Sequence, residues 1–222
     1  MTNVRNSDSR ENRQTMISEI EFQDALNHAK EIKNDFLKLR ALAVLSVLRL
    51  TGKRRGEIAV LPLQNLKLEG RFLNVSFILE KKRKEKVLQK LATKSLLLSD
   101  PLTRNILTYL EYLNKLEPKP KFWLPRAKSV FGTIIVLTDS HISGRQVFNI
   151  VRGLSETIWP HLFRETVASD VIKQDNSIIA AFKVQRRLDL ADFRTGFNYL
   201  KRFAVDVIER EEEEKGDIIE RG

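Results

Sequence analysis

Hydrophobic residues recur at helical spacing along most of the chain. Residues 18–32 and 102–116 each carry a stripe of apolar side chains with the three- and four-residue spacing of an amphipathic helix. Residues 36–48 are apolar on every side, which is typical of a buried central helix. Gly52 predicts the end of that helix, because glycine readily adopts the left-handed capping conformation. Further helices are predicted to start near Arg55, to follow a cap at Ser140 or Ser143, to start at Pro160, and to cover residues 177–187 and 193–210.

The spacing changes to an alternating one between Asn65 and Leu98. This pattern predicts short strands, which a turn at Glu69-Gly70 and a charged connection over residues 80–86 would join into an antiparallel sheet. We therefore predict an α+β, mainly α fold: a helical domain with a small three-stranded antiparallel sheet. The predicted strands of that sheet cover residues 66–68, 72–79 and 87–91, and one more short strand is predicted over residues 131–137, after a proline-containing loop over residues 119–126.

Charge points to the partner. The 222-residue chain has 39 Lys and Arg against 29 Asp and Glu, a formal net charge of +10. Such a balance favours nucleic acid as the partner first and an acidic membrane surface second. The absence of cysteine excludes disulfides, thiol catalysis and cysteine-ligated metals, and three scattered histidines do not suggest a metal cage. We therefore predict no cofactor and no metal.

The remaining composition bears on compartment and domain boundaries. No apolar run approaches the roughly 20 residues of a membrane span, and the N-terminus has no signal-peptide pattern. These features predict a cytoplasmic, nucleoid-associated protein without a membrane partner. Because there are no repeats and no Gly/Ser linker, we expect one domain over residues 18–210, between a flexible arm (1–17) and an acidic tail (211–222).

Candidate chemistry is concentrated in the second half of the chain. His161 and Arg164 are three residues apart on a predicted helix, so both side chains leave one face. A guanidinium binds two phosphate oxygens at once, and an imidazole handles a proton. With Arg54 from a glycine-containing turn and Tyr199 downstream, the set would cradle and attack a phosphodiester. Each residue also has a plainer interpretation, as a surface charge or, for Tyr199, as a core aromatic.

Four segments together resemble the catalytic domain of the tyrosine recombinases, the phage-integrase and Xer-like family. Thr51 to Glu57 is similar to the family's T-G-x-R-x-x-E box, in which Glu57 would support the arginine from inside the fold. Residues 75–88 resemble the family hairpin that holds an active lysine. Residues 160–166 resemble its H-x-L-R-H-T box, and residues 187–199 resemble its L-G-H…T-T…Y segment. The resemblance covers roughly residues 20–210 and implies DNA strand cleavage and rejoining.

The resemblance implies a role for each candidate residue. Tyr199 would attack a DNA phosphodiester and form a 3′-phosphotyrosyl intermediate, while Arg54 and Arg164 would neutralise the transition state. Lys81, in the best-matching register of the hairpin, would protonate the leaving 5′-oxygen, and His161 would accept or orient the tyrosine proton. The family also implies double-stranded DNA as the partner, and self-association on that DNA from dimer to tetramer.

Departures from the family pattern leave alternatives open. Leu190 stands where the family has histidine or tryptophan, Glu165 replaces the second histidine, and the segment before Ser18 has no room for the usual DNA-clamping domain. A type IB topoisomerase-like enzyme, a catalytically impaired DNA-binding protein of recombinase fold, and a basic structural protein remain as rival interpretations. Other hairpin cations could replace Lys81 as the acid, and the donor absent at Leu190 could come from a neighbouring segment. The residues concerned are Lys82, Arg83, Lys84 and Lys86 in the hairpin, and Lys183, Arg186 and Arg187 before Leu190.

Overall fold

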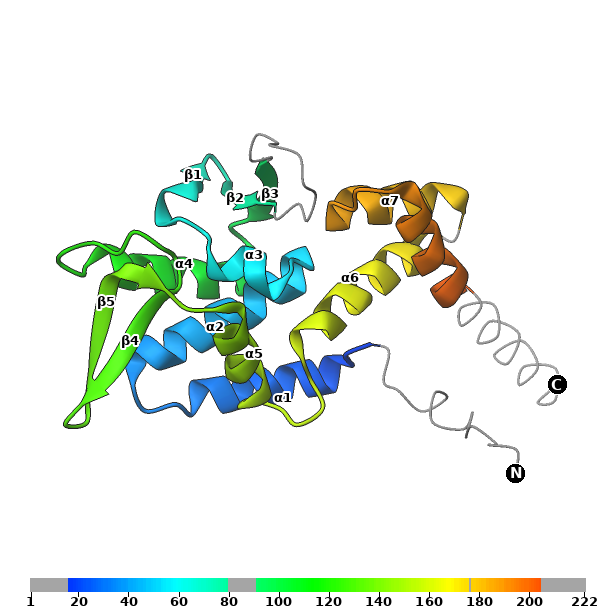
Figure 1. The fold of residues 1–222 in the computed structure, drawn as a ribbon. Helices are drawn as coiled ribbons and strands as arrows, with labels where there is room; N and C mark the ends of the chain where they lie inside the picture. The colour runs from blue at the N-terminus through cyan, green and yellow to red at the C-terminus, as the bar shows by residue number, and fades with distance from the viewer. Residues whose placement is uncertain (1–15, 80–90, 176, 205–222) are drawn as a thin grey trace, which may run out of the picture.

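The computed structural model describes residues 16–79, 91–175 and 177–204, and the fold is mainly helical (Figure 1). A last helical segment follows the named elements, from residue 193 to residue 204, where the described part ends. The fold class predicted from the sequence is confirmed. In chain order the elements are α1 (Glu19–Lys30), α2 (Asp35–Thr51), α3 (Arg55–Ala59), the 3-10 turn η1 (Leu63–Asn65), β1 (Leu66–Glu69), β2 (Phe72–Ile78), β3 (Leu91–Leu97), α4 (Pro101–Asn114), β4 (Pro125–Val130), β5 (Thr133–His141), α5 (Gly144–Arg152), α6 (Pro160–Gln174) and α7 (Ile178–Leu188).

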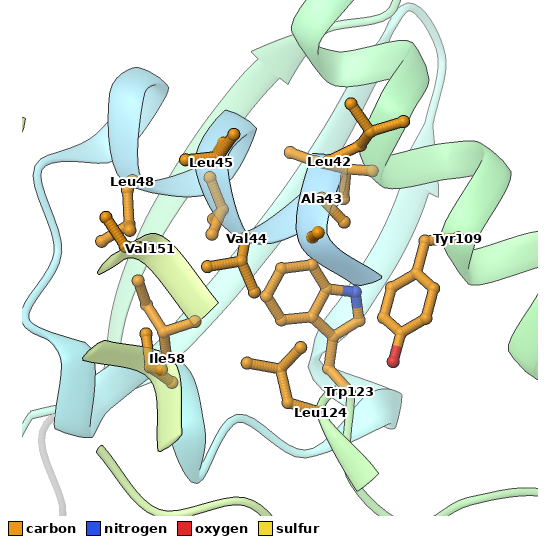
Figure 2. Close-up of a cluster of buried hydrophobic side chains, with 14 of the residues drawn as sticks. Leu42, Ala43, Val44, Leu45, Leu48, Ile58, Tyr109, Trp123, Leu124 and Val151 are labelled. Carbon is orange, nitrogen blue, oxygen red and sulfur yellow. The ribbon is translucent and has the colours of Figure 1, made fainter. Parts of the chain in front are cut away.

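Most buried side chains belong to one cluster around α2, which we call the large core. Ten residues of α2 are buried, in agreement with the apolar residues on all its sides. Figure 2 shows the indole of Trp123 among the side chains of α2 and α4, and its ring centroid lies 5.9 Å from that of Tyr109 in an edge-on arrangement. The large core also includes Phe36, Val44, Leu45, Leu48, Ile58, Leu73, Phe77, Val151, Leu162 and Phe163.

A second cluster, which we call the small core, lies where the chain ends. It joins the C-terminal half of α6 to α7 and to the last helical segment, on the right in Figure 1. Helix α6 therefore serves both clusters, because its first turns carry Leu162 and Phe163 into the large core. The small core consists of Val167, Ala168, Ile172, Ala180, Ala181, Val184, Leu188, Leu200 and Phe203.

The three-stranded sheet has the order β1-β2-β3, and all pairs are antiparallel. The described part of its third strand covers residues 91–97, so the strand extends six residues beyond the predicted end at residue 91, with Lys94 opposite Val75. Alternate residues of β3 face inward, and Lys94 is one of them. A lysine at an inward position interrupts the alternation that sequence analysis depends on. Residues 80–90, which include Lys81 and the rest of the predicted strand, lie outside the described residues.

A two-stranded hairpin, β4–β5, replaces the single strand predicted over residues 131–137. Phe131 and Gly132 form its tip, with positive φ angles of 49° and 81°, so the predicted strand began inside a turn. Strand β4 was missed because its residues, including Arg126 and Lys128, are mostly polar or small and follow a proline-containing loop. The fold therefore contains a second small sheet that was not predicted.

The ends of the helices agree with the sequence signals. Ser143 rather than Ser140 caps α5, and its hydroxyl accepts a hydrogen bond from the Gln146 N–H. Gly52 caps α2 with a φ of 61°, and a Cβ at Gly52 would lie 2.5 Å from Leu188 Cδ2. Glycine is therefore required here both for backbone conformation and for space, since α7 ends against this turn.

Ile17, assigned to the arm by sequence, is buried, and its N–H donates to Thr166 Oγ1 at 2.9 Å. No helix among the described residues is long and apolar enough to cross a membrane.

Candidate active site

Arg54 immediately precedes α3, at the turn that follows α2. Its side chain is 55% exposed, whereas the side chain of Glu57 is buried beneath it, with Oε1 3.2 Å from Arg54 Nη1. The other Glu57 oxygen accepts the Arg54 backbone N–H at 3.0 Å. A buried carboxylate thus holds an outward-facing guanidinium, which is the support for Arg54 that the box at residues 51–57 implied.

Arg164, on the second turn of α6, is 4% exposed and is anchored to the C-terminal ends of α2 and α7. Its guanidinium donates to the Gly52 carbonyl and to the Leu188 carbonyl, each at 2.8 Å. Burial and the nearby charge of Arg54 lower the pKa of Arg164, although a guanidinium still stays protonated at neutral pH. The helix that carries His161 therefore places a fixed buried cation beside Arg54.

His161 extends towards solvent from the start of α6, and its Nε2 lies 3.0 Å from Glu165 Oε1, one turn further on. The second Glu165 oxygen lies 2.8 Å from Arg202 Nη1, on the last helical segment. Glu165 occupies the place of the family's second histidine. Here its carboxylate connects the imidazole to the segment that carries Tyr199.

Tyr199 lies half-buried on the segment from 193 to 204, and its ring stacks near that of Phe203 with centroids 6.3 Å apart. The pKa of Tyr199 is raised, because burial and the charge of Glu165 outweigh the opposing effects of Arg164 and Arg54. The charges of both arginines are near enough to the phenol to oppose that rise in its pKa. Four of the five predicted site residues therefore come together, and the fifth, Lys81, lies outside the described residues.

A cavity of about 610 Å³ opens beside these groups. Arg54, His161 and Arg164 line it together with Lys53. Among the described residues, no cluster of His, Asp or Glu could hold a metal ion. The charge of this cavity therefore comes from cationic side chains, and its electrostatics suit an anion.

Sequence analysis missed a buried ion cluster behind the arginines. Lys53 Nζ and Lys94 Nζ each lie 2.8 Å from Asp189 Oδ2, and Lys94 also donates to the Arg186 carbonyl at 3.1 Å. Burial raises the pKa of Asp189, but the two lysines lower it more, so the net shift is downward. Burial lowers the pKa of Lys94 despite the attraction of Asp189. Asp189 has a φ of 50° and stands at the glycine position of the L-G-H segment. An aspartate in place of that glycine was the only sign in the sequence that this position has a special role.

Leu190 is half-buried and packs against the small core. Two of the cations that could have replaced the family's donor there have other partners: Lys183 lies 2.6 Å from Asp175 Oδ2, and Arg187 donates to the Leu50 carbonyl at 2.7 Å. The pKa of Asp175 is lowered to about 2 through hydrogen bonds from Lys183 and Ser177. The position therefore packs a side chain and supplies no hydrogen bond to a phosphate.

No protein-family model matches the sequence, and no curated protein matches it either. Solved structures do match the fold. The crystal structure of XerA recombinase has a TM-score of 0.57 at 20% identity and covers 83% of this chain and 59% of its own. XerH site-specific recombinase bound to difH substrate, in a pre-cleavage complex, has a TM-score of 0.62 at 15% identity and covers 88% of this chain. XerH bound to palindromic difH substrate, in a post-cleavage complex, has the same TM-score at 17% identity and covers 97% of this chain.

This chain spans just over half the length of these relatives, from 52% of the first XerH chain to 59% of the XerA chain. Identities of 15–20% establish the fold and leave the activity to be tested. The chain has the fold of the catalytic domain of the tyrosine site-specific recombinases of the Xer type.

Proposed function

We propose that this protein is a site-specific DNA recombinase or integrase that cleaves and rejoins DNA strands through a 3′-phosphotyrosyl intermediate. The observation that carries the proposal is the buried Arg164, which two backbone carbonyls anchor in the cavity that Arg54 and His161 also line. The charges of Arg164 and Arg54 both oppose the rise in the pKa of Tyr199. Two fixed cations next to a phenol suit an attack on a phosphodiester, because negative charge gathers on the non-bridging oxygens in the transition state. The fold shared with the Xer recombinases supports the same chemistry.

In the proposed reaction, the Tyr199 oxygen attacks phosphorus and the bond to the 5′-oxygen breaks. The phenolic proton passes to His161, which Glu165 orients from 3.0 Å, and Lys81 supplies a proton to the leaving 5′-oxygen. Arg54 and Arg164 hold the phosphate throughout. A 5′-hydroxyl from the partner strand then attacks the phosphotyrosyl ester and rejoins the DNA, so the bond energy is conserved without ATP. Strand exchange between two DNA sites would require self-association, from dimers to tetramers.

Covalent trapping tests the proposal. The protein would be incubated with end-labelled, nicked duplexes, and labelled protein would be detected on a denaturing gel. We expect a labelled band in the native protein and in Tyr112→Phe, a half-buried tyrosine on α4, but none in Tyr199→Phe. A two-site assay then distinguishes recombination from supercoil relaxation, which would indicate a type IB topoisomerase-like enzyme. A Tyr199→Phe variant that still forms the adduct would disprove the assignment of the nucleophile.

Leu190 favours a second candidate, a catalytically impaired DNA-binding protein of the same fold. Its side chain packs where the family has a hydrogen-bond donor, and Lys183 and Arg187 have partners elsewhere. Duplexes selected from a random library for tight binding would decide between the two. Tight binding of these duplexes without any adduct would support the impaired protein, whereas an adduct would reject it.

A further inference from the structure

Beyond the residues that the proposed reaction uses, two arginines extend into the same cavity from neighbouring helices. Arg55 is the first residue of α3, and Arg145 is the second residue of α5. Both line the cavity that contains Arg54 and Arg164. The reaction assigns neither of them a role.

Both guanidiniums lie against one aromatic ring. Arg145 Cζ is 5.0 Å and Arg55 Cζ 5.5 Å from the ring centroid of Phe148, which also lines the cavity. The starts of α3 and α5 are close enough to allow this arrangement. A Cβ at Gly144 would lie 3.5 Å from the Gly56 backbone and 3.4 Å from Arg55 Cγ. The ring therefore holds two cations from different helices in one place.

Charge balance indicates what this place is for. Among the described residues, Arg54 has Glu57 as its carboxylate partner, but neither Arg55 nor Arg145 has a carboxylate oxygen within 4.0 Å of its guanidinium. Two like charges on one ring repel each other. The positive end of the nine-residue helix α5 adds to the same potential. An exposed cation–π contact contributes only about 0.5–1 kcal/mol, so stacking by itself is a weak reason to gather two arginines beside a positive helix end. A bound anion would offset the repulsion.

We propose that Arg55 and Arg145, stacked on Phe148, form a second phosphate site that holds the DNA backbone next to the phosphodiester attacked by Tyr199. This inference rests on the proposed function for the identity of the anion. Arg54 and Arg55 are consecutive residues, and both line the cavity. A strand whose reacting phosphate meets Arg54 therefore passes Arg55, which we expect to meet a neighbouring phosphate of the same strand. The site takes any sequence, because it contacts phosphate and no base.

The experiment measures how DNA affinity depends on salt. Binding of a fluorescent duplex would be followed over a range of salt concentrations in the Tyr199→Phe background, which prevents cleavage. Each phosphate contact contributes about 0.9 to the slope of log K against log salt, so we expect the double alanine variant, Arg55→Ala with Arg145→Ala, to reduce the slope by about 0.9 and each single alanine variant to reduce it by less. The double Arg→Lys variant keeps the charges and should keep the slope. Phe148→Leu frees both guanidiniums and should weaken binding with a smaller change in slope.

A matched control comes from the sheet. Arg71 is an exposed arginine whose Cζ lies 5.4 Å from the Phe72 ring centroid, in the β1–β2 turn and away from this cavity. Arg71→Ala should leave the slope unchanged. Thermal unfolding would verify that each variant folds, which we expect because Arg55 and Arg145 are exposed.

Two results would overturn the inference. If the double alanine variant kept the native slope while Arg54→Ala reduced it, DNA would occupy the cavity without using this site. An unchanged slope in both the double alanine variant and Arg54→Ala would mean that DNA does not enter the cavity at all. Failure of the proposed function looks different, because it is the absence of a Tyr199 adduct in the native protein. If the protein binds DNA but never cleaves it, losing the second phosphate site in the alanine variants should still reduce the slope.

Discussion

The two cores differ in size and in what they contribute to the candidate site. The large core spans α1 to the start of α6 and holds the positions of Arg54, His161 and Arg164, the groups that would bind phosphate and move a proton. The small core consists of nine buried residues from α6, α7 and the last helical segment, and it carries Tyr199. The groups that activate a phosphate and the group that attacks it therefore belong to different packing units.

A polar seam joins the two cores. We define the seam as Lys53, Lys94, Arg164 and Asp189. Arg164 hydrogen bonds to the carbonyls of Gly52 and Leu188, and the residues that follow these two, Lys53 and Asp189, form an ion pair at 2.8 Å. Apolar packing alone tolerates small shifts, whereas short charged contacts fix distance and angle. The difference between the cores teaches that the placement of Tyr199 depends on polar contacts as well as on apolar packing.

The largest effect should follow from removing the residue that belongs to both the seam and the site. In Arg164→Ala we expect the rate of covalent adduct formation to fall by about 10²–10³ or more, as when a transition-state donor is removed. Arg164→Lys keeps the charge but cannot reach both carbonyls in the same geometry, so it should restore DNA affinity more than rate. Single-turnover trapping with saturating DNA measures the rate. A loss smaller than tenfold in Arg164→Ala would mean that Arg164 joins the two cores without acting on the phosphate.

Removing charge from the seam should destabilise the fold. Asp189→Asn keeps a side chain that tolerates a positive φ but leaves Lys53 and Lys94 unpaired, which we expect to cost about 3 kcal/mol. The pKa of Asp189 is lowered in the folded protein, so its stabilising effect is complete above the unfolded value of about 3.9 and is lost as the pH falls below it.

Urea unfolding at about pH 7 and about pH 3 would measure this difference. The gap between the native protein and Asp189→Asn should be wide at the higher pH and should narrow at the lower one. Asp139→Asn is the matched control, because its carboxylate also lies 2.8 Å from a lysine, Lys121, but on an exposed surface where such pairs contribute little. Equal effects of the two variants at neutral pH would contradict a special role for the seam.

The contacts of the seam could not be predicted from the sequence, whereas most helices could. Helices were predictable because caps and apolar spacing are local, as Ser143 and Gly52 illustrate. Arg54, His161, Arg164 and Tyr199 could be predicted as candidates because each stands in a short sequence motif. In contrast, a lysine in a strand is expected to face solvent unless its counter-charge is known. The counter-charge of the inward-facing Lys94 is Asp189, which is distant from it in the sequence. The stacking of Arg55 and Arg145 on one ring likewise required two helix starts to be brought together by the fold.

A smaller effect should follow from altering packing within the small core alone. Gly196 lies one turn before Tyr199, and a Cβ at this position would collide with the Ala181 backbone carbonyl of α7. Alanine gains up to about 1 kcal/mol of helix propensity, but overpacking against a backbone atom costs about 1–3 kcal/mol, so we expect net destabilisation in Gly196→Ala. The adduct rate should fall more than DNA affinity, since the arginines stay in place. Asn198→Ala, an exposed change on the same helical segment, is the control. Equal losses of adduct rate and DNA affinity in Gly196→Ala would show that a change in the small core also displaces the arginines held by the large core.

The smallest effect concerns the charge of Glu165, which reaches across both cores. Its oxygens lie 3.0 Å from His161 and 2.8 Å from Arg202, and its charge helps to raise the pKa of Tyr199. In Glu165→Gln that contribution disappears while Arg164 and Arg54 still act, so the pKa of Tyr199 should fall.

Phenolate absorbance would be titrated in each protein and in its Tyr199→Phe counterpart, and the difference isolates one of the three tyrosines. Asp170→Asn, which removes the partner of Arg49 from the same helix, should leave the midpoint where it is. If Glu165→Gln also left it unchanged, Glu165 would act on His161 and Arg202 alone. A lower midpoint would instead show that the charge of one carboxylate of α6 raises the pKa of the phenol that would attack the phosphate.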